Sequence, residues 1–253
     1  MPKCRLCGRE RVCLVNAHVI ARSFFKIVRG KGDYSVGMEA KRGSPLKTPY
    51  YQAGVADTSI LCEECERKFT KWDTYGFEIL SISRGAADAI ASSKDGTHLA
   101  IPIENLDYDR FILFILSVLW RASVSSILFY RNVNLGPFEE PIREALWNNR
   151  APEPAEYVVM LGTSLNQRYP NVILRPERCR PDNIHFYRLF FPNYFAHVKA
   201  DNRPATIIMR QAMIQRRAVN YIFCFPYNRS PYLRFFEGLA KTIRNNKKPN
   251  GLK

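Results

Sequence analysis

The sequence predicts an α+β protein, with an N-terminal metal-binding region followed by helices and then by antiparallel strands. Three observations lead to this prediction. Two cysteine pairs with the same C-x2-C spacing lie within the first 80 residues. A nearly apolar stretch at 111–120 is typical of a buried helix. Beyond residue 155, short runs of β-branched and aromatic residues favour strands. We therefore divide the chain into two domains, 1–80 and 81–253.

The first domain opens with the sequence CRLCG, in which Gly8 follows the second cysteine and permits a tight turn. The β-branched residues of NAHVI, 16–20, favour a short strand. Residues 29–56 are rich in Gly, Lys, Pro and Tyr and predict a long loop or a loose hairpin. A helix is expected to begin near Cys62, where apolar residues recur at helical spacing.

The second domain is expected to begin with helices and to continue with strands. Asp107 is a candidate N-cap for the apolar helix, and Pro137 suits a helix start. The expected helices are 77–93, 106–130 and 137–149, and the expected strands are 157–165, 171–176, 184–191, 194–200, 205–213 and 218–225. The aromatic residues of the fourth and neighbouring strands are interpreted as sheet packing. A last helix is expected at 231–245.

Charge points to a polyanionic partner. The formal net charge is +15, and apolar residues make up 46% of the chain, as in globular proteins. Residues 1–31 contain eight Lys or Arg and one acid, and residues 241–253 contain five basic residues and no acid. Such an excess is most often matched by nucleic acid, although a solvated basic surface that aids solubility is the alternative.

We expect a cytoplasmic protein without membrane contact. No apolar segment of the signal-peptide type follows the N-terminus, because basic residues occupy those positions. The apolar stretch at 111–120 is far shorter than the roughly 20 residues that a bilayer requires.

The cysteines predict a structural zinc site. Seven cysteines are present, and an odd number in a chain of this type argues against a disulfide framework. Cys4 and Cys7 form one pair, and Cys62 and Cys65 form the other. Four thiolates would close the coordination shell, so such a zinc would stabilise the fold and take no part in catalysis. The alternative is four unpaired thiols. Cys13, Cys179 and Cys224 stand alone and are interpreted as ordinary thiols.

The motifs CRLCG, AHVI and ILCEEC together resemble the HNH endonuclease superfamily, from residue 4 to about residue 75. The resemblance implies a ββα-metal fold built on a treble-clef zinc scaffold. It also implies that His18 is the general base, that Asp57 takes the place of the family's middle Asn, and that Glu66 takes the last motif position. The longer segment AHVIARSFFK is similar to a bacterial subgroup that carries S-H-I-I-P-x-F.

These residue types suit phosphodiester hydrolysis. A neutral histidine can accept a proton from an attacking water. Mg²⁺ or Mn²⁺ prefers oxygen ligands, which Asp57 and Glu66 can supply, with Asp73 as a weaker candidate. The sequence departs from the family pattern at Ala17, where many members carry a metal-binding Asp.

Two functions are therefore compared. The first is a metal-dependent endonuclease that cleaves duplex DNA. The second is a non-catalytic, zinc-stabilised module that binds nucleic acid, which Ala17 favours. Either could be a homo-oligomer or a subunit of a larger complex, for example in phage defence. No role is assigned to His98, His185 or His197.

Overall fold

The fold is a mixed α+β structure, as the sequence predicts. The computed structural model describes residues 2–29, 35–36, 50–51, 54–92, 100–165, 172–226 and 237. The helices are α1 (Arg22–Arg29), α2 (Glu63–Ser92), α3 (Tyr108–Val124), α4 (Glu139–Trp147) and α5 (Ile207–Ala212), with 3-10 turns η1 (Leu128–Tyr130), η2 (Gly136–Phe138) and η3 (Pro181–Asn183). The strands are β1 (Ala17–His18), β2 (Ser35–Val36), β3 (Tyr50–Tyr51), β4 (Ala56–Asp57), β5 (Ala100–Glu104), β6 (Val159–Leu165), β7 (Glu177–Cys179), β8 (Phe186–Phe191), β9 (Tyr194–Lys199) and β10 (Val219–Pro226).

The main sheet has six strands in the order β5-β10-β6-β9-β8-β7. The expectation of a purely antiparallel sheet is wrong, because β10 pairs parallel with β6. The other pairs in this sheet are antiparallel. The last strand therefore enters the middle of the sheet, between β5 and β6.

Helix α3 is the buried helix that the apolar stretch predicts. Its N-cap is Asp107, whose carboxylate accepts a hydrogen bond from the backbone N–H of Arg110 at 3.1 Å. Every residue from Phe111 to Ala122 is buried. Among the helices in the described part of the chain, none combines the length and the apolarity that crossing a bilayer requires.

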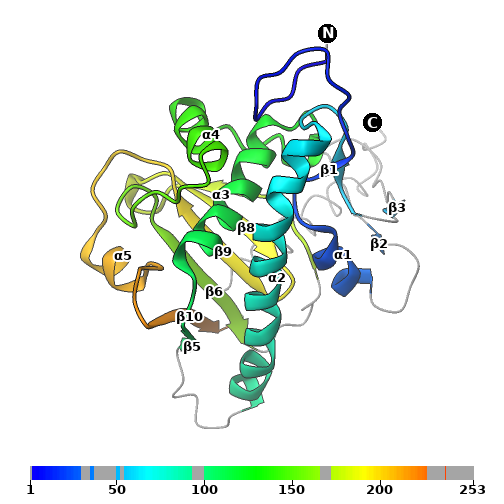
Figure 1. Ribbon diagram of the computed structural model, residues 1–253. Helices are drawn as coiled ribbons and strands as arrows, with labels where there is room; N and C mark the ends of the chain where they lie inside the picture. Colours follow the sequence, from blue (N-terminus) through cyan, green and yellow to red (C-terminus); the bar gives the residue numbers. More distant parts are fainter. Residues whose placement is uncertain are drawn as a thin grey trace, which may run out of the picture.

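Helices α2 and α3 lie over one face of the sheet (Figure 1). On β8, Tyr187, Leu189 and Phe191 belong to the core cluster under these helices, whereas Phe186 and Phe190 belong to clusters on the other face. This is the alternation that a strand imposes. The aromatic residues of β8 and β9 are thus packed within the sheet, as expected.

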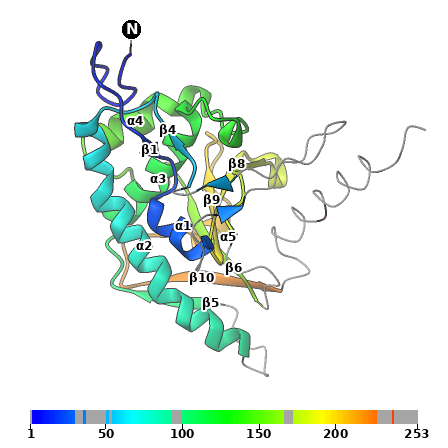
Figure 2. The ribbon, with the colours of Figure 1, turned by 90° about the vertical axis from the view of Figure 1, so that its right-hand side faces the viewer.

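The N-terminal segment packs into the same core. Phe24 of α1 lies with its ring centroid 5.2 Å from Phe77 of α2, 6.0 Å from Phe114 of α3 and 5.1 Å from Phe191 of β8. Figure 2 shows α1 at the junction of α2 and the sheet. Gly76 permits the close approach of α2 to α3, because a Cβ there would lie 2.2 Å from the Phe114 ring.

The expected boundary at residue 80 falls inside α2. This helix runs without a break from Glu63 to Ser92, so the separately expected helix 77–93 is its continuation. One cluster of buried residues extends from Cys4 to Cys224. The two regions therefore share one hydrophobic core.

Two strand expectations are wrong. Residues 205–213 contain helix α5, because the Thr206 hydroxyl caps the helix by accepting a hydrogen bond from the Met209 N–H at 3.2 Å. Residues 172–176 form no strand, and the chain enters β7 only afterwards.

Within the expected loop 29–56, the described residues of β2 and β3 pair antiparallel. The expected helix 231–245 lies outside the described residues, apart from 237.

Candidate metal centre and the surroundings of His18

The structure brings the two cysteine pairs together. The Sγ atoms of Cys4, Cys7, Cys62 and Cys65 all lie within 4.8 Å of one another. The first pair sits on a turn closed by a hydrogen bond of 2.9 Å from the Gly8 N–H to the Cys4 carbonyl, and Gly8 has a φ of 73°. The second pair lies at the start of α2. Zn–S bonds of about 2.3 Å in a tetrahedron place sulfurs roughly 3.8 Å apart, so these four cysteines can hold a metal ion such as zinc.

The surroundings favour a thiolate at Cys4, whereas burial raises the pKa of Cys62, and the hydrogen bond to Cys4 together with burial raises the pKa of Cys65. A hydrogen bond from the Cys65 side chain, together with nearby backbone N–H groups, lowers the pKa of Cys4 to about 4. The backbone N–H of Cys62 donates to Cys4 Sγ at 3.4 Å, and Arg9 Nε donates to Cys7 Sγ at 3.4 Å. Arg9 also forms an ion pair with Glu64. A guanidinium beside the cluster would offset the negative charge of a metal ion held by four thiolates.

A two-stranded ribbon connects the cysteine pairs to His18. In this ribbon β1 pairs antiparallel with β4, with Ala17 opposite Asp57 and His18 opposite Ala56. The chain on either side is tied to the cysteine turn and to α2, because the Val15 N–H donates to the Leu61 carbonyl at 2.9 Å. Strands β1 and β4 and the start of α2 thus lie beside the four thiols, and α1, β2 and β3 come between β1 and β4 in the chain.

Asp57 is buried and its carboxylate is fully hydrogen-bonded. Its Oδ1 accepts from the Ser59 N–H at 2.8 Å and from the Ser59 hydroxyl at 2.5 Å. Its Oδ2 accepts from the Ser125 hydroxyl at 2.7 Å, from the Ser126 N–H at 2.8 Å and from the Ser126 hydroxyl at 3.2 Å. Burial alone would raise the pKa of Asp57, but these hydrogen bonds outweigh it and the pKa is lowered.

Asp57 and His18 project from opposite faces of the ribbon. Residues directly opposite each other in an antiparallel pair share a face, and neighbours along a strand alternate. Asp57 therefore shares its face with Ala17, and His18 shares the other face with Ala56. The ribbon brings the two residues onto adjacent strands without turning their side chains toward each other.

Glu66 and Asp73 of α2 do lie beside His18. The backbone N–H of His18 donates a hydrogen bond to the Glu66 carboxylate, and burial raises the pKa of Glu66. Glu66 Oε2 is buried and has no hydrogen-bond partner among the described residues. Burial also raises the pKa of Asp73, while Arg121 and His18 act in the opposite direction.

Arg121 is the residue of this cluster that the sequence analysis missed. It donates to the His18 carbonyl at 2.6 Å and forms an ion pair with Asp73 at 2.6 Å. The signal was present, because Arg121 is a single charge between buried Trp120 and Ala122 on an apolar helix. A charge at such a position requires a buried partner.

The predicted donors do not form a site for Mg²⁺ or Mn²⁺ as they stand. Both oxygens of Asp57 are occupied by hydrogen-bond donors, and both oxygens of Asp73 bind Arg121. Of the three predicted carboxylates, only that of Glu66 retains an oxygen, Oε2, without a hydrogen-bond partner in the described part of the chain. Mg²⁺ is often bound by one or two carboxylates together with substrate phosphates and waters, so Glu66 is the predicted donor that remains available for a cation.

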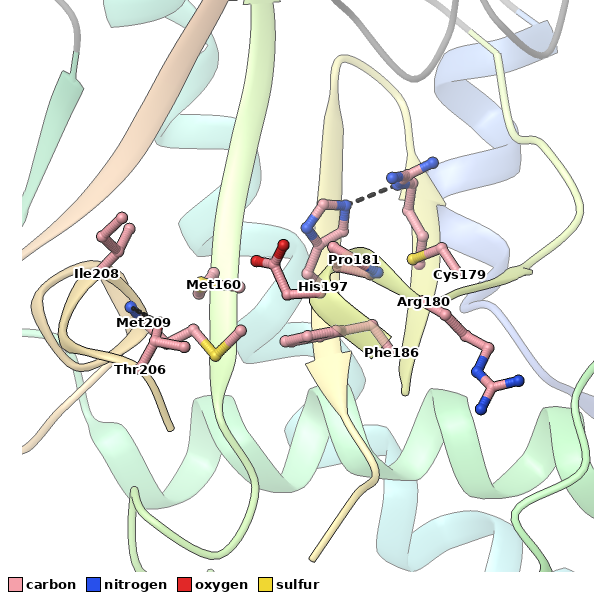
Figure 3. Close-up of a pocket in the computed structure, with 11 residues that line it drawn as sticks. Met160, Cys179, Arg180, Pro181, Phe186, His197, Thr206, Ile208 and Met209 are labelled. Carbon is pink, nitrogen blue, oxygen red and sulfur yellow. Dashed lines mark hydrogen bonds between the residues drawn. The ribbon is translucent and has the colours of Figure 1, made fainter. Parts of the chain in front are cut away.

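A separate cavity of about 520 Å³ lies on the other face of the main sheet. Figure 3 shows Met160, Phe186 and His197 among the residues around it. Arg188 Nε donates to His197 Nε2 at 2.6 Å, and burial together with Arg188 lowers the pKa of His197 to about 3. His197 is therefore a neutral acceptor within the sheet.

Comparisons of the chain with protein-family models, with curated proteins and with solved structures found no match.

Proposed function

We propose that this protein is an HNH-type nuclease with a structural zinc, in which His18 is the general base. The observation that carries the proposal is the position of His18. It is half-buried on a ribbon tied to both cysteine pairs, and its backbone is hydrogen-bonded on both sides by charged residues.

For phosphodiester hydrolysis, the protein must position the scissile phosphate and the attacking water and must provide a proton acceptor. The imidazole of His18 accepts a proton from water while the water oxygen forms a bond to phosphorus. The bond between phosphorus and the leaving sugar oxygen breaks, and that oxygen gains a proton from solvent.

Helix α1 supports nucleic acid as the substrate. It begins four residues after His18, and its Arg22 and Lys26 are exposed on one side while Phe24 and Phe25 are buried on the other. Within the described residues, neither Arg22 nor Lys26 has an ion-pair partner. Two available cations next to the proposed base suit the phosphates that flank a cleavage site.

The contacts of Asp57 modify the expected metal site. Its five hydrogen bonds support a structural role, so the proposal does not assign a cation to it. Glu66 remains the predicted ligand for Mg²⁺ or Mn²⁺, with substrate oxygens completing the coordination.

The second candidate is a zinc-stabilised module that binds nucleic acid without cleaving it. Ala17 in place of the family's Asp and the occupied carboxylate of Asp57 favour this candidate. Both candidates share the zinc, the basic α1 and an affinity for polyanions. They differ only in whether His18 performs chemistry, and either could act within a defence complex.

Plasmid cleavage with Mg²⁺ or Mn²⁺ separates the two candidates. We expect His18→Ala to reduce the cleavage rate by at least about 100-fold, the low end for removing a general base. DNA affinity and zinc content should stay near those of the wild type. His185→Ala is the matched control, because His185 contacts Arg178 and Asp201 at the start of β8 and lies outside the predicted site, so this variant should leave the rate unchanged. Equal rates for His18→Ala and wild type would leave only the binding module.

A further inference from the structure

Arg121 occupies the centre of a buried polar cluster between α2 and α3. Its side chain is 0% exposed, and that of Asp73 is 13% exposed. The guanidinium also lies 4.8 Å from the centre of the Phe69 ring. A charge in such surroundings is costly unless every donor is satisfied.

All five N–H groups of Arg121 have acceptors. Nε donates to the Ser117 carbonyl at 3.2 Å, and Nη2 donates to the Ser117 hydroxyl at 3.1 Å and to Asp73 Oδ1 at 2.6 Å. Nη1 donates to Asp73 Oδ2 at 2.9 Å and to the His18 carbonyl at 2.6 Å. The planar fork of arginine makes this set possible, whereas a lysine ammonium has only three donors and a different geometry.

His18 receives support from two charged side chains at once. Its carbonyl accepts from Arg121, and its N–H donates to Glu66. Glu66 in turn interacts electrostatically with Arg121. Both polar groups of the His18 backbone are thus fixed by one ionic cluster.

Stability alone is a weak explanation for such a cluster. A buried ion pair is often replaced by apolar residues of similar size without loss of stability, because desolvation offsets much of the attraction. The more specific property of this cluster is geometric. It defines where the backbone of residue 18 lies relative to α2 and α3.

We propose that Arg121, held by Asp73, is a positioning residue that orients His18 for its reaction. This inference rests on the proposed nuclease function. It also gives the region after residue 80 a part in the site, since Arg121 belongs to α3 and Asp73 to α2. A fragment limited to the HNH-like segment would lack the residue that fixes its own base.

The test compares Arg121→Lys with wild type and with Arg188→Lys. Arg188 is a matched control because its side chain is also largely buried, at 13% exposed, and is paired with Glu177, but it lies on β8. A displaced general base lowers kcat, and misplacement by about 1 Å can cost roughly 100-fold. We expect Arg121→Lys to reduce kcat by about 10- to 100-fold, with KM within about twofold, and Arg188→Lys to change neither.

A double-mutant cycle distinguishes positioning from general damage. If Arg121 acts through His18, then Arg121→Lys should cause no further fall in rate in a His18→Ala background. An equal fall in both backgrounds would overturn the proposal. Should Arg121→Lys not fold, Asp73→Asn takes its place in the same cycle, since it removes an acceptor from Arg121 with little change in shape.

Hydrogen exchange of the His18 amide provides a readout that does not need activity. Arg121 fixes the His18 carbonyl and interacts with Glu66, which accepts from the His18 amide. The amide should therefore be protected in wild type and should exchange at least about tenfold faster in Arg121→Lys, which corresponds to weakening its hydrogen bond by about 1.4 kcal/mol. Wild-type kcat together with unchanged exchange in the folded variant would overturn the positioning role alone. A wild type that cleaves nothing would overturn the nuclease and with it the catalytic positioning role, and the exchange measurement would then report only whether Arg121 fixes the His18 backbone.

Discussion

Asp57 is a single carboxylate that joins the ribbon to the segment after α3. Its donors come from Ser59, two residues away, and from Ser125 and Ser126, far along the chain. The buried carboxylate thereby accepts from backbone and hydroxyl groups of serines that are themselves exposed or half-buried. A carboxylate is well suited to this place because it accepts several hydrogen bonds and donates none.

We expect Asp57→Asn to lower the free energy of unfolding by about 1.5–3 kcal/mol, because the amide cannot accept all five hydrogen bonds. The lowered pKa of Asp57 also predicts how the stability of the protein depends on pH. Its stabilisation is complete above the ordinary Asp pKa of about 3.9 and is lost as pH falls through the lower folded value. Asp57→Asn should lack that loss. Urea titrations between pH 2 and pH 7 would measure both effects.

Asp109→Asn is the control for this prediction, because Asp109 is an exposed carboxylate on α3. A different outcome would support the predicted role of Asp57 as a metal ligand. If Asp57→Asn keeps wild-type stability and instead loses binding of Mn²⁺ in calorimetry, Asp57 is a cation ligand and the structural interpretation is wrong.

At the scale of elements, α1 combines two functions on two faces. Its aromatic face anchors the N-terminal segment in the core, and its basic face carries Arg22 and Lys26. The four-residue spacing places the two cations on one side of the helix. The helix follows β1 directly, so the basic face lies close to His18 along the chain.

We expect the double variant Arg22→Ala/Lys26→Ala to weaken duplex DNA binding and to flatten its salt dependence. Each lost phosphate contact should reduce the slope of log affinity against log salt by about 0.9. Fluorescence anisotropy at several salt concentrations measures the slope. Arg150→Ala/Arg210→Ala removes the same charge elsewhere, with Arg210 on α5 at the opposite side of the molecule from α1 (Figure 1). Equal slopes for the two double variants would exclude α1 from the interface.

Local chemistry explains which elements the sequence could predict. Asp107 caps α3 through a residue three positions away, and the apolar pattern of that helix is local as well. The segment 205–213 was wrongly predicted as a strand, because its β-branched residues favour a strand while Thr206 provides a helix cap. The parallel pairing of β10 with β6 depends on residues distant in the chain, which no local pattern encodes.

The candidate site likewise has a part that the sequence could predict and a part that it could not. The cysteine cluster followed from spacing, because each pair is local and zinc chemistry requires four ligands. The contacts of Asp57 with Ser125 and of His18 with Arg121 could not be derived, since both join distant residues through tertiary packing. Arg121 was detectable only as an unexplained charge in an apolar helix.

At the scale of the whole molecule, the cysteine cluster is part of the hydrophobic core. Cys4, Cys62 and Cys65 are buried within the same cluster as Phe69 and Trp72. Loss of a metal at this point would therefore loosen the start of α2 and the ribbon together. The two expected domains would not unfold independently.

We expect purified protein to contain about one zinc per chain. Cys4→Ser should lose the metal and lower the melting temperature, whereas Cys13→Ser should change neither, because Cys13 is exposed and lies outside the cluster. Elemental analysis and thermal unfolding measure the two quantities. A Cys4→Ser protein with full zinc content would contradict the four-cysteine site.

The central place of β10 has a consequence for the order in which the chain folds during synthesis. In the described sheet, β5 pairs only with β10, and β10 is the last strand to leave the ribosome. Strand β5 must therefore wait, without a neighbour, until most of the chain has been translated. Pairings between such distant segments form slowly. The nascent protein thus carries an open sheet edge until its final strand closes the gap between β5 and β6.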